Sequence, residues 1–112
     1  VEATFQNCSC LTSVTIPDSV TTIGECAFAG CSSLATVTVP NCVTSIETCA
    51  FFDCSSLTSV YCKPTTPPAG GSGIFGLNAS DRKIYVPMES ENEYKSASNW
   101  DQYADAIVGY DF

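Results

Sequence analysis

The residues of this 112-residue chain best suited to chemistry are its eight cysteines, because thiolates form disulfides and bind soft metal ions. Cys8, Cys31 and Cys54 stand 23 residues apart, and Cys26 and Cys49 repeat the same interval. Three roles are open to them: buried thiols that pack as small apolar side chains, disulfides between neighbouring turns, or a metal site built without histidine. Repetition explains their spacing more economically than metal coordination does. Three cysteines outside this register are the better candidates for disulfide-bonded or exposed thiols: Cys10, Cys42 and Cys62.

Other groups that could carry catalysis are scarce. The chain has no histidine, which is the usual general base at neutral pH. The stretch GGSGIFG lacks the Lys-Ser/Thr pair that completes a phosphate-binding loop. The acidic residues near the C-terminus lack the spacing of a calcium loop and are more typical of a solvated helix face. They are Glu89, Glu91, Glu93, Asp101 and Asp105. We therefore predict a protein that is not an enzyme and has no catalytic, cofactor-binding or metal-binding residues.

The charge balance excludes several classes of partner. The net charge is −8 and the chain has four basic residues, of which only Arg82 and Lys83 are adjacent. Such a chain cannot neutralise the phosphates of a nucleic acid. No apolar run approaches the ~20 residues that a membrane-spanning helix needs. We expect a monomer that binds no nucleic acid and does not insert into a membrane.

The 23-residue interval extends far beyond the cysteines. It relates three phenylalanines, three leucines and three valines: Phe5, Phe28, Phe51, Leu11, Leu34, Leu57, Val14, Val37 and Val60. Agreement at so many positions indicates a tandem array. Downstream, Phe75 precedes Ile84 by nine residues, as Phe28 precedes Val37. Residues 74–87 are therefore a degenerate repeat shifted by one residue, with Asn78 in the position of Cys54. The first repeat begins within the repeated phrase, so we expect further repeats upstream.

Each repeat predicts one strand and one further apolar side. Val37 and Val39 alternate with Thr36 and Thr38, which is the pattern of a half-buried strand, and Pro40 ends it. The following stretch VTSIETCAF supplies a second set of apolar residues: Val43, Ile46, Ala50 and Phe51. A single repeat cannot bury these residues, whereas stacked repeats can. The sequence predicts a short β-solenoid with a parallel sheet on one face, over residues 1–87.

The pattern changes after Pro87, and we predict a small helical C-terminal cap over residues 88–112. Ser90 followed by Glu93 is a capping-box signature for a helix over about 91–98. Trp100, Tyr103 and Ile107 have the spacing of one further helical turn. A cap is expected because the end of a solenoid exposes strand edges and core. The stretch KPTTPPAGGSG before the last repeat reads as an exposed loop.

The residues that alternate with the buried valines should line the outer face of the sheet. With the lysines beside them they form our candidate partner-binding face: Ser13, Thr15, Thr36, Thr38, Ser59, Tyr61, Lys63, Lys83 and Tyr85. Solenoids bind partners on extended sheet faces, and tyrosine is a favoured interface anchor. Tyr61 and Tyr85 could instead pair across strands and only shield the sheet.

The stretches IPDSVTTIGECAFAGCSSL and VPNCVTSIETCAFFDCSSL resemble the BspA-like leucine-rich repeat proteins. The tail IYVPMESENEYKSASNWDQYADAIVGYDF is also similar to the end of such proteins. The resemblance implies a short right-handed leucine-rich-repeat solenoid, at the cell surface or secreted. It also implies host–microbe adhesion, with extracellular host or microbial proteins as partners, matrix and plasma proteins such as fibronectin and fibrinogen among them.

From the repeats, the missing catalytic groups and this resemblance, we predict a non-catalytic adhesion or protein-recognition module located outside the cell. Two alternatives stay open from the sequence. One is a passive spacer, in which the cap only closes the array. The other is a glycan-binding module in which Tyr61 and Tyr85 form a stacking platform.

Overall fold

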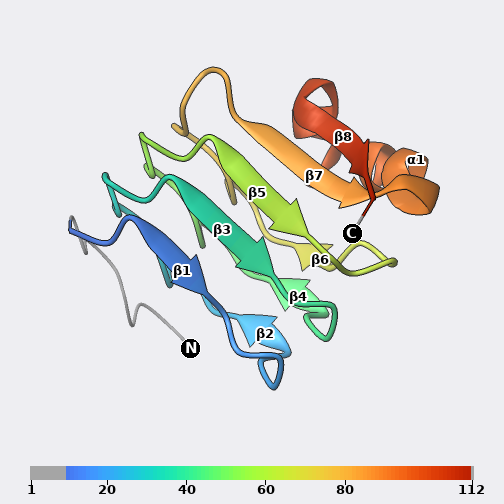
Figure 1. Ribbon diagram of the computed structural model, residues 1–112, viewed down its shortest axis with the longest axis horizontal. Helices are drawn as coiled ribbons and strands as arrows, with labels where there is room; N and C mark the ends of the chain where they lie inside the picture. The colour runs from blue at the N-terminus through green and yellow to red at the C-terminus, as the bar shows by residue number, and fades with distance from the viewer. Residues whose placement is uncertain (1–9, 112) are drawn as a thin grey trace.

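The computed structural model describes residues 10–111 and contains two sheets. Through the repeats, successive strands along the chain belong to the larger and to the smaller sheet in turn. The larger sheet has the order β1-β3-β5-β7-β8, and all of its pairs are parallel. Its strands are β1 (Ser13–Thr15), β3 (Thr36–Val39), β5 (Ser59–Cys62), β7 (Lys83–Pro87) and β8 (Ile107–Tyr110). Figure 1 shows these strands side by side, with β1 at one end and β8 at the other.

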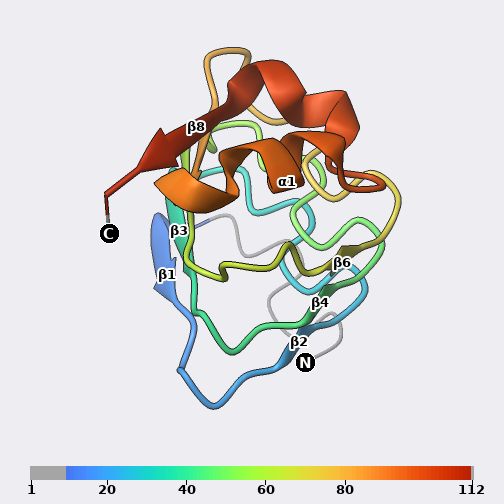
Figure 2. The same cartoon turned by 90° about the vertical axis from the view of Figure 1, so that its right-hand side faces the viewer.

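A second, smaller parallel sheet forms another wall of the solenoid (Figure 2). It consists of β2 (Thr22–Ile23), β4 (Ser45–Ile46) and β6 (Ala69–Gly70), in that order. The apolar pattern predicts a sheet on one face only and, for this part of the repeat, simply a second apolar side. The dipeptides Thr22-Ile23 and Ser45-Ile46 pair as short strands because the stacked turns hold them in register.

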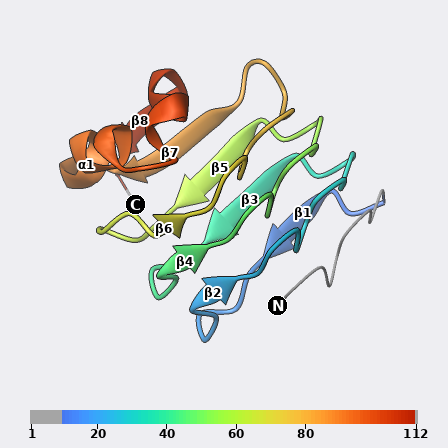
Figure 3. The same cartoon turned by 180° about the vertical axis from the view of Figure 1, so that it is seen from behind.

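The strand register confirms the repeat. Ser13 lies opposite Thr36, and Thr36 opposite Ser59, an offset of 23 residues each time. Ser59 then lies opposite Lys83, an offset of 24, so the degenerate repeat pairs with the one-residue shift that the sequence predicts. Figure 3 shows the turns stacked one above another from the other side.

The core lies between the two sheets and is built from equivalent residues in columns. The rings of Phe28, Phe51 and Phe75 stack with centroid separations of 5.2 and 5.6 Å. Val37, Val39 and the other inward residues of β3 and β5 are fully buried. Since one turn cannot bury such side chains alone, each turn depends on its neighbours for stability.

Asn78 makes the same contact as the cysteine that it replaces. The thiol of Cys54 donates to the carbonyl oxygen of Phe28 at 3.1 Å. One turn later, Nδ2 of Asn78 donates to the carbonyl oxygen of Phe51 at 2.9 Å and to that of Cys54 at 3.3 Å. The prediction that Asn78 occupies the cysteine position is therefore confirmed.

The segment that we interpret as the cap contains η1 (Met88–Ser90), α1 (Glu91–Ser96), η2 (Asp101–Ala106) and β8. The predicted capping box is wrong, because no side-chain capping bond forms at Ser90 and its hydroxyl donates to the carbonyl oxygen of Thr65 at 2.6 Å. The predicted final helical turn is a 3-10 helix, and Ile107 begins a strand that extends the sheet. The cap thus continues the sheet as well as covering the core.

The stretch before the last repeat is not a simple exposed loop. Pro64 and Pro68 are buried, and Ala69–Gly70 form β6. The cap binds its carbonyl groups: Tyr94 donates to Pro64 at 2.6 Å and the Trp100 indole to Pro68 at 2.8 Å. Both donors are large side chains with no exposed surface. The prolines and glycines that indicate a loop also leave carbonyl groups free to accept these bonds.

Candidate partner-binding face

Two rows of side chains cross the outer face of the larger sheet, as the alternation predicts. The strand register sets each member of a row opposite the next. One row is Ser13, Thr36, Ser59 and Lys83, and the other is Thr15, Thr38, Tyr61, Tyr85 and Val108. All of these side chains are exposed or half-buried, while the valines and isoleucines between them are buried or half-buried. Lys63, the ninth predicted residue, follows β5 directly and is exposed.

A cluster of three tyrosines lies where this face reaches the cap. The rings of Tyr61 and Tyr85 stack with centroids 5.0 Å apart and an interplanar angle of 15°. Tyr110 of β8 presents its edge to both, with centroids at 5.7 Å from Tyr61 and 5.3 Å from Tyr85. We call Tyr61, Tyr85 and Tyr110 the tyrosine cluster.

Sequence reasoning misses Tyr110, because the spacing after Trp100 predicts a helical turn. The run Ile107-Val108-Gly109-Tyr110 has the β-branched and aromatic residues typical of a strand, and this signal could have identified β8. The structure brings Tyr110 into contact with two of the nine predicted residues. The serine and threonine of β1 lie at the other end of the face.

The surface around the tyrosine cluster is unusually apolar. Among the described residues, four large hydrophobic side chains are exposed, and three of them lie here: Met88, Val108 and Tyr110. A cavity of about 310 Å³ opens beside Tyr110. It is lined by Lys63, Thr65, Pro87, Met88, Glu89, Tyr110 and Asp111. Apolar patches with a polar rim of this kind are typical of interaction surfaces.

The four basic residues of the chain fall into two groups. Lys63 and Lys83 lie near the tyrosines, whereas Lys95 and Arg82 contact other side chains. Lys95 pairs with Glu91 at 2.9 Å. The guanidinium of Arg82 lies over the Tyr103 ring, 5.0 Å from its centroid, and burial lowers its pKa. Lys63 and Lys83 are exposed near opposite ends of the tyrosine cluster. Since Glu89 and Asp111 line the same cavity as Lys63, the patch carries both signs of charge.

The free edge of the sheet next to the cluster is protected. The Glu91 carboxylate lies beside the backbone of Gly109 in β8, and its pKa is lowered by Lys95 first and by the Gly109 backbone as well. A Cβ atom at Gly109 would lie 2.7 Å from the Glu91 carboxylate, so α1 is packed closely against this strand. Edge pairing with another chain is therefore hindered at β8.

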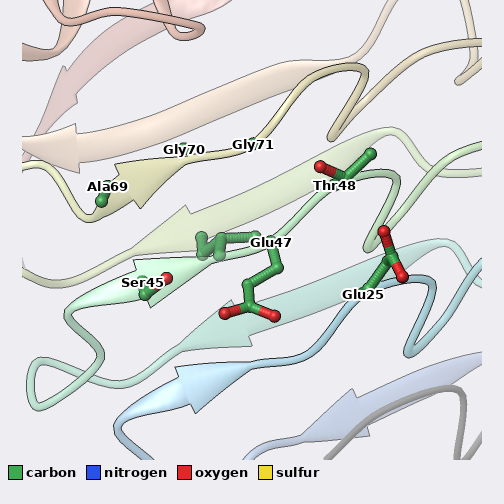
Figure 4. A pocket seen from close by; sticks show the side chains of 8 residues that line it. Glu25, Ser45, Glu47, Thr48, Ala69, Gly70 and Gly71 are labelled. Atoms are coloured by element: carbon green, nitrogen blue, oxygen red, sulfur yellow. The ribbon is translucent and has the colours of Figure 1, made fainter.

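A second groove, of about 360 Å³, lies along the smaller sheet (Figure 4). Glu25 and Glu47 of consecutive turns line it together with Thr48, Gly70 and Gly71. Among the described residues, no three of the His, Cys, Asp and Glu side chains are arranged to hold a metal ion.

The cysteines fall into three settings, and none of the seven described ones is in a disulfide. Cys10 and Cys42 are exposed, which is one of the two predicted alternatives for them. The prediction that Cys62 is exposed or disulfide-bonded is wrong, because it is completely buried beneath the cap. Burial raises the pKa of its thiol to about 12. Cys31 and Cys54 are buried, Cys26 and Cys49 are partly exposed, and Cys8 lies outside the described residues.

In the described part of the chain, no helix is long and apolar enough to cross a membrane. No curated protein matches the chain. The model of the BspA type leucine-rich repeat region matches residues 1–96, with six copies. This match covers most of the chain and agrees with the stacked parallel strands, so the chain belongs to the BspA-type leucine-rich repeat family.

Proposed function

We propose that this chain is a non-catalytic adhesion module, displayed at the cell surface or secreted, that binds extracellular or matrix proteins of a host. Its leucine-rich repeat family indicates a repeat module for protein interaction, typically non-catalytic and surface-associated. The observation that carries the proposal is the tyrosine cluster, which joins the exposed apolar side chains into one patch. The remaining members of the nine-residue face form the rest of the contact surface.

The cluster has the properties of a binding hot spot. Tyrosine offers a large contact area with few rotatable bonds, so little entropy is lost on binding. Mutual ring packing and the strand ladder hold the three rings in place before a partner arrives. The lysines and carboxylates around them can form rim contacts that orient a protein partner.

Fibronectin and fibrinogen are the candidate partners, because the resemblance of the repeats implies them. The test is binding of the purified chain to each immobilised protein, compared with a Tyr61→Ala/Tyr110→Ala variant. Loss of one hot-spot side chain at about 2 kcal/mol weakens binding about 30-fold, and loss of both weakens it by up to about 1,000-fold. Exposed cross-strand pairs contribute only about 0.2–1 kcal/mol to folding, so the variant keeps its fold.

A matched control is Ser13→Ala/Thr15→Ala, which changes the same face at the β1 end. It should bind within about two-fold of the unchanged chain, since rim positions contribute little. Saturable binding that the tyrosine variant retains would contradict the placement of the site. Binding to a glycan panel alone would favour the glycan-binding alternative, and no binding to any surface would favour a passive spacer.

A further inference from the structure

We propose that Cys26 and Cys49 are a disulfide site that joins two consecutive turns of the solenoid when a small-molecule disulfide is present. Each cysteine lies on the corner that follows a short strand of the smaller sheet, β2 for Cys26 and β4 for Cys49. Both residues are distinct from the tyrosine cluster, so this modification goes beyond the proposed partner binding.

Backbone hydrogen bonds place the two cysteines opposite each other. The N–H of Cys26 donates to the carbonyl oxygen of Thr48 at 3.0 Å, and that of Phe28 to Ala50 at 2.8 Å. In a parallel ladder this pattern sets Cys49 directly beside Cys26. Neighbouring strands lie ~4.8 Å apart, within the Cα separations of about 4.4–6.8 Å that a disulfide bridges.

Backbone conformation alone does not explain cysteine at this corner. Cys26 and Cys49 have φ values of 58° and 59°, in the left-handed region that favours glycine. The equivalent position of the next turn is Gly73, with φ of 65°, and the N–H of Cys49 donates to Ser72 beside it at 3.0 Å. Glycine adopts this backbone conformation without strain. The presence of cysteine at the two earlier corners must therefore be explained by what the cysteine side chains do.

The sulfur of Cys49 points along the stack. A Cβ atom added to Gly73 would lie 3.6 Å from Sγ of Cys49. Cys26 has a matching φ value and lies opposite Cys49 as Cys49 lies opposite Gly73. In the rotamer of Cys49, the Cys26 sulfur would therefore lie next to Cβ of Cys49. Rotation of the Cys49 side chain about χ1, away from Gly73, is then the movement that the bond requires. Partial burial first, and then Cys49 and Glu25, raise the pKa of Cys26, in agreement with neighbouring thiols.

Accessibility distinguishes this pair from the other stacked pair. Cys26 and Cys49 are both partly exposed. Cys31 and Cys54 occupy equivalent positions of the same two turns, but neither has any exposed surface. Desolvation raises the pKa of Cys54 to about 12, which disfavours its reactive thiolate. A reagent in solution therefore reaches Cys26 and Cys49 before it reaches Cys31 and Cys54.

The reaction is two thiol–disulfide exchanges with glutathione disulfide as the oxidant. The Cys26 thiolate attacks one glutathione sulfur, the S–S bond breaks, and a glutathione thiolate leaves. The Cys49 thiolate then attacks the Cys26 sulfur of the mixed disulfide and displaces the second glutathione thiolate. The two protons released by the protein thiols protonate the two leaving thiolates. Two protein thiols are oxidised and one glutathione disulfide is reduced.

The test uses the full chain with Cys8, Cys10 and Cys42 replaced by serine, which removes the exposed thiols and Cys8. The folded protein is treated with glutathione disulfide at about pH 9, where thiols exchange readily, and then alkylated. Peptide mapping by mass spectrometry should find a Cys26–Cys49 bond in most molecules. The urea midpoint should rise with that bond and return after reduction, because a cross-link restricts the unfolded chain.

The matched control is Cys49→Ser in the same background. Here the first exchange can occur and the second cannot, so a glutathione mixed disulfide should accumulate on Cys26. The proposal is overturned by glutathione on both Cys26 and Cys49 of the same molecule, by a bond to Cys31, Cys54 or Cys62 instead, or by five unmodified thiols.

Discussion

The indole nitrogen of Trp100 donates to the carbonyl oxygen of Pro68 at 2.8 Å, across 32 residues of sequence. A residue of the cap thereby satisfies a buried backbone acceptor in the stretch that precedes the last repeat. Nearby, Asn99 binds the carbonyl of Gly70 at 2.7 Å, and Tyr94 and Ser90 bind those of Pro64 and Thr65. The cap is thus attached to the array by side chains that bind backbone, in addition to its strand.

Trp100→Phe tests this attachment. Phenylalanine keeps a buried ring but leaves the Pro68 carbonyl without its donor and a small space beside it, so the free energy of unfolding should fall by about 2–4 kcal/mol. Urea unfolding followed by circular dichroism measures the change. Gln102→Ala, at an exposed position of η2, is the control and should change stability by less than about 0.5 kcal/mol. Equal stability of Trp100→Phe and the parent chain would contradict this role.

Gly71→Ala should be poorly tolerated. A Cβ atom at Gly71 would lie 2.3 Å from the backbone nitrogen of Thr48, which belongs to the neighbouring turn and cannot rotate away. We expect a loss of about 2–3 kcal/mol, typical of overpacking against a rigid neighbour. Thermal unfolding of this variant should be compared with that of Ser72→Ala, an exposed neighbour. If the two variants have the same melting temperature, the prediction is contradicted, because the neighbouring turns must then move apart to make room for the added Cβ atom.

Replacement of Asn78 separates hydrogen bonding from space filling. Asn78→Ala removes the donor to Phe51 and Cys54 and should lower stability by about 1–3 kcal/mol. Asn78→Cys restores the residue that the preceding turn uses at this position, where the thiol donates to a carbonyl group. It should therefore recover part of the loss, as measured by chemical denaturation. If both variants lose the same amount of stability, the prediction is contradicted, and cysteine cannot replace asparagine at this position of the shifted repeat.

Alkaline pH should destabilise the chain through its buried thiols. Burial raises the pKa of Cys62 and Cys54 from 9.0 to about 12, so between these values the unfolded chain has lost protons that the folded chain still holds. Stability from these groups is fully present below pH 9 and is lost as pH rises towards 12, by up to about 1.4 kcal/mol per pH unit per group. Cys62→Val, which copies the valine of Val39 opposite it, removes one such group. Its urea midpoint should fall less steeply with pH above 9, and an identical slope would contradict the assignment.

Sequence reasoning is most successful where a residue recurs. The columns of Phe28, Val37 and Cys54 are predictable because their 23-residue spacing allows only stacked turns. It fails where a segment occurs once and tertiary contacts decide its structure. Ser90 has the neighbours of a helix cap, but its hydroxyl donates instead to the carbonyl of Thr65, which folding brings next to it.

Most of the candidate face is predictable for the same reason. Tyr61 and Tyr85 alternate with buried residues in recognisable strands, so their side of the sheet follows from the pattern. Tyr110 lies on a strand outside the repeat, where no earlier copy reveals its register. The other residues that line its cavity come from the stretch after β5, the end of β7 and the cap, and only folding brings them together.

The tyrosine cluster takes one ring from each of β5, β7 and β8, so the spacing of its rings is fixed by the ladder at the capped end. Another 23-residue turn placed before β3 would lengthen the rod without moving any of the three. The length of the array and the arrangement of the tyrosine rings are therefore separately adjustable in this architecture: the number of turns sets the first, and the last two turns and the cap set the second.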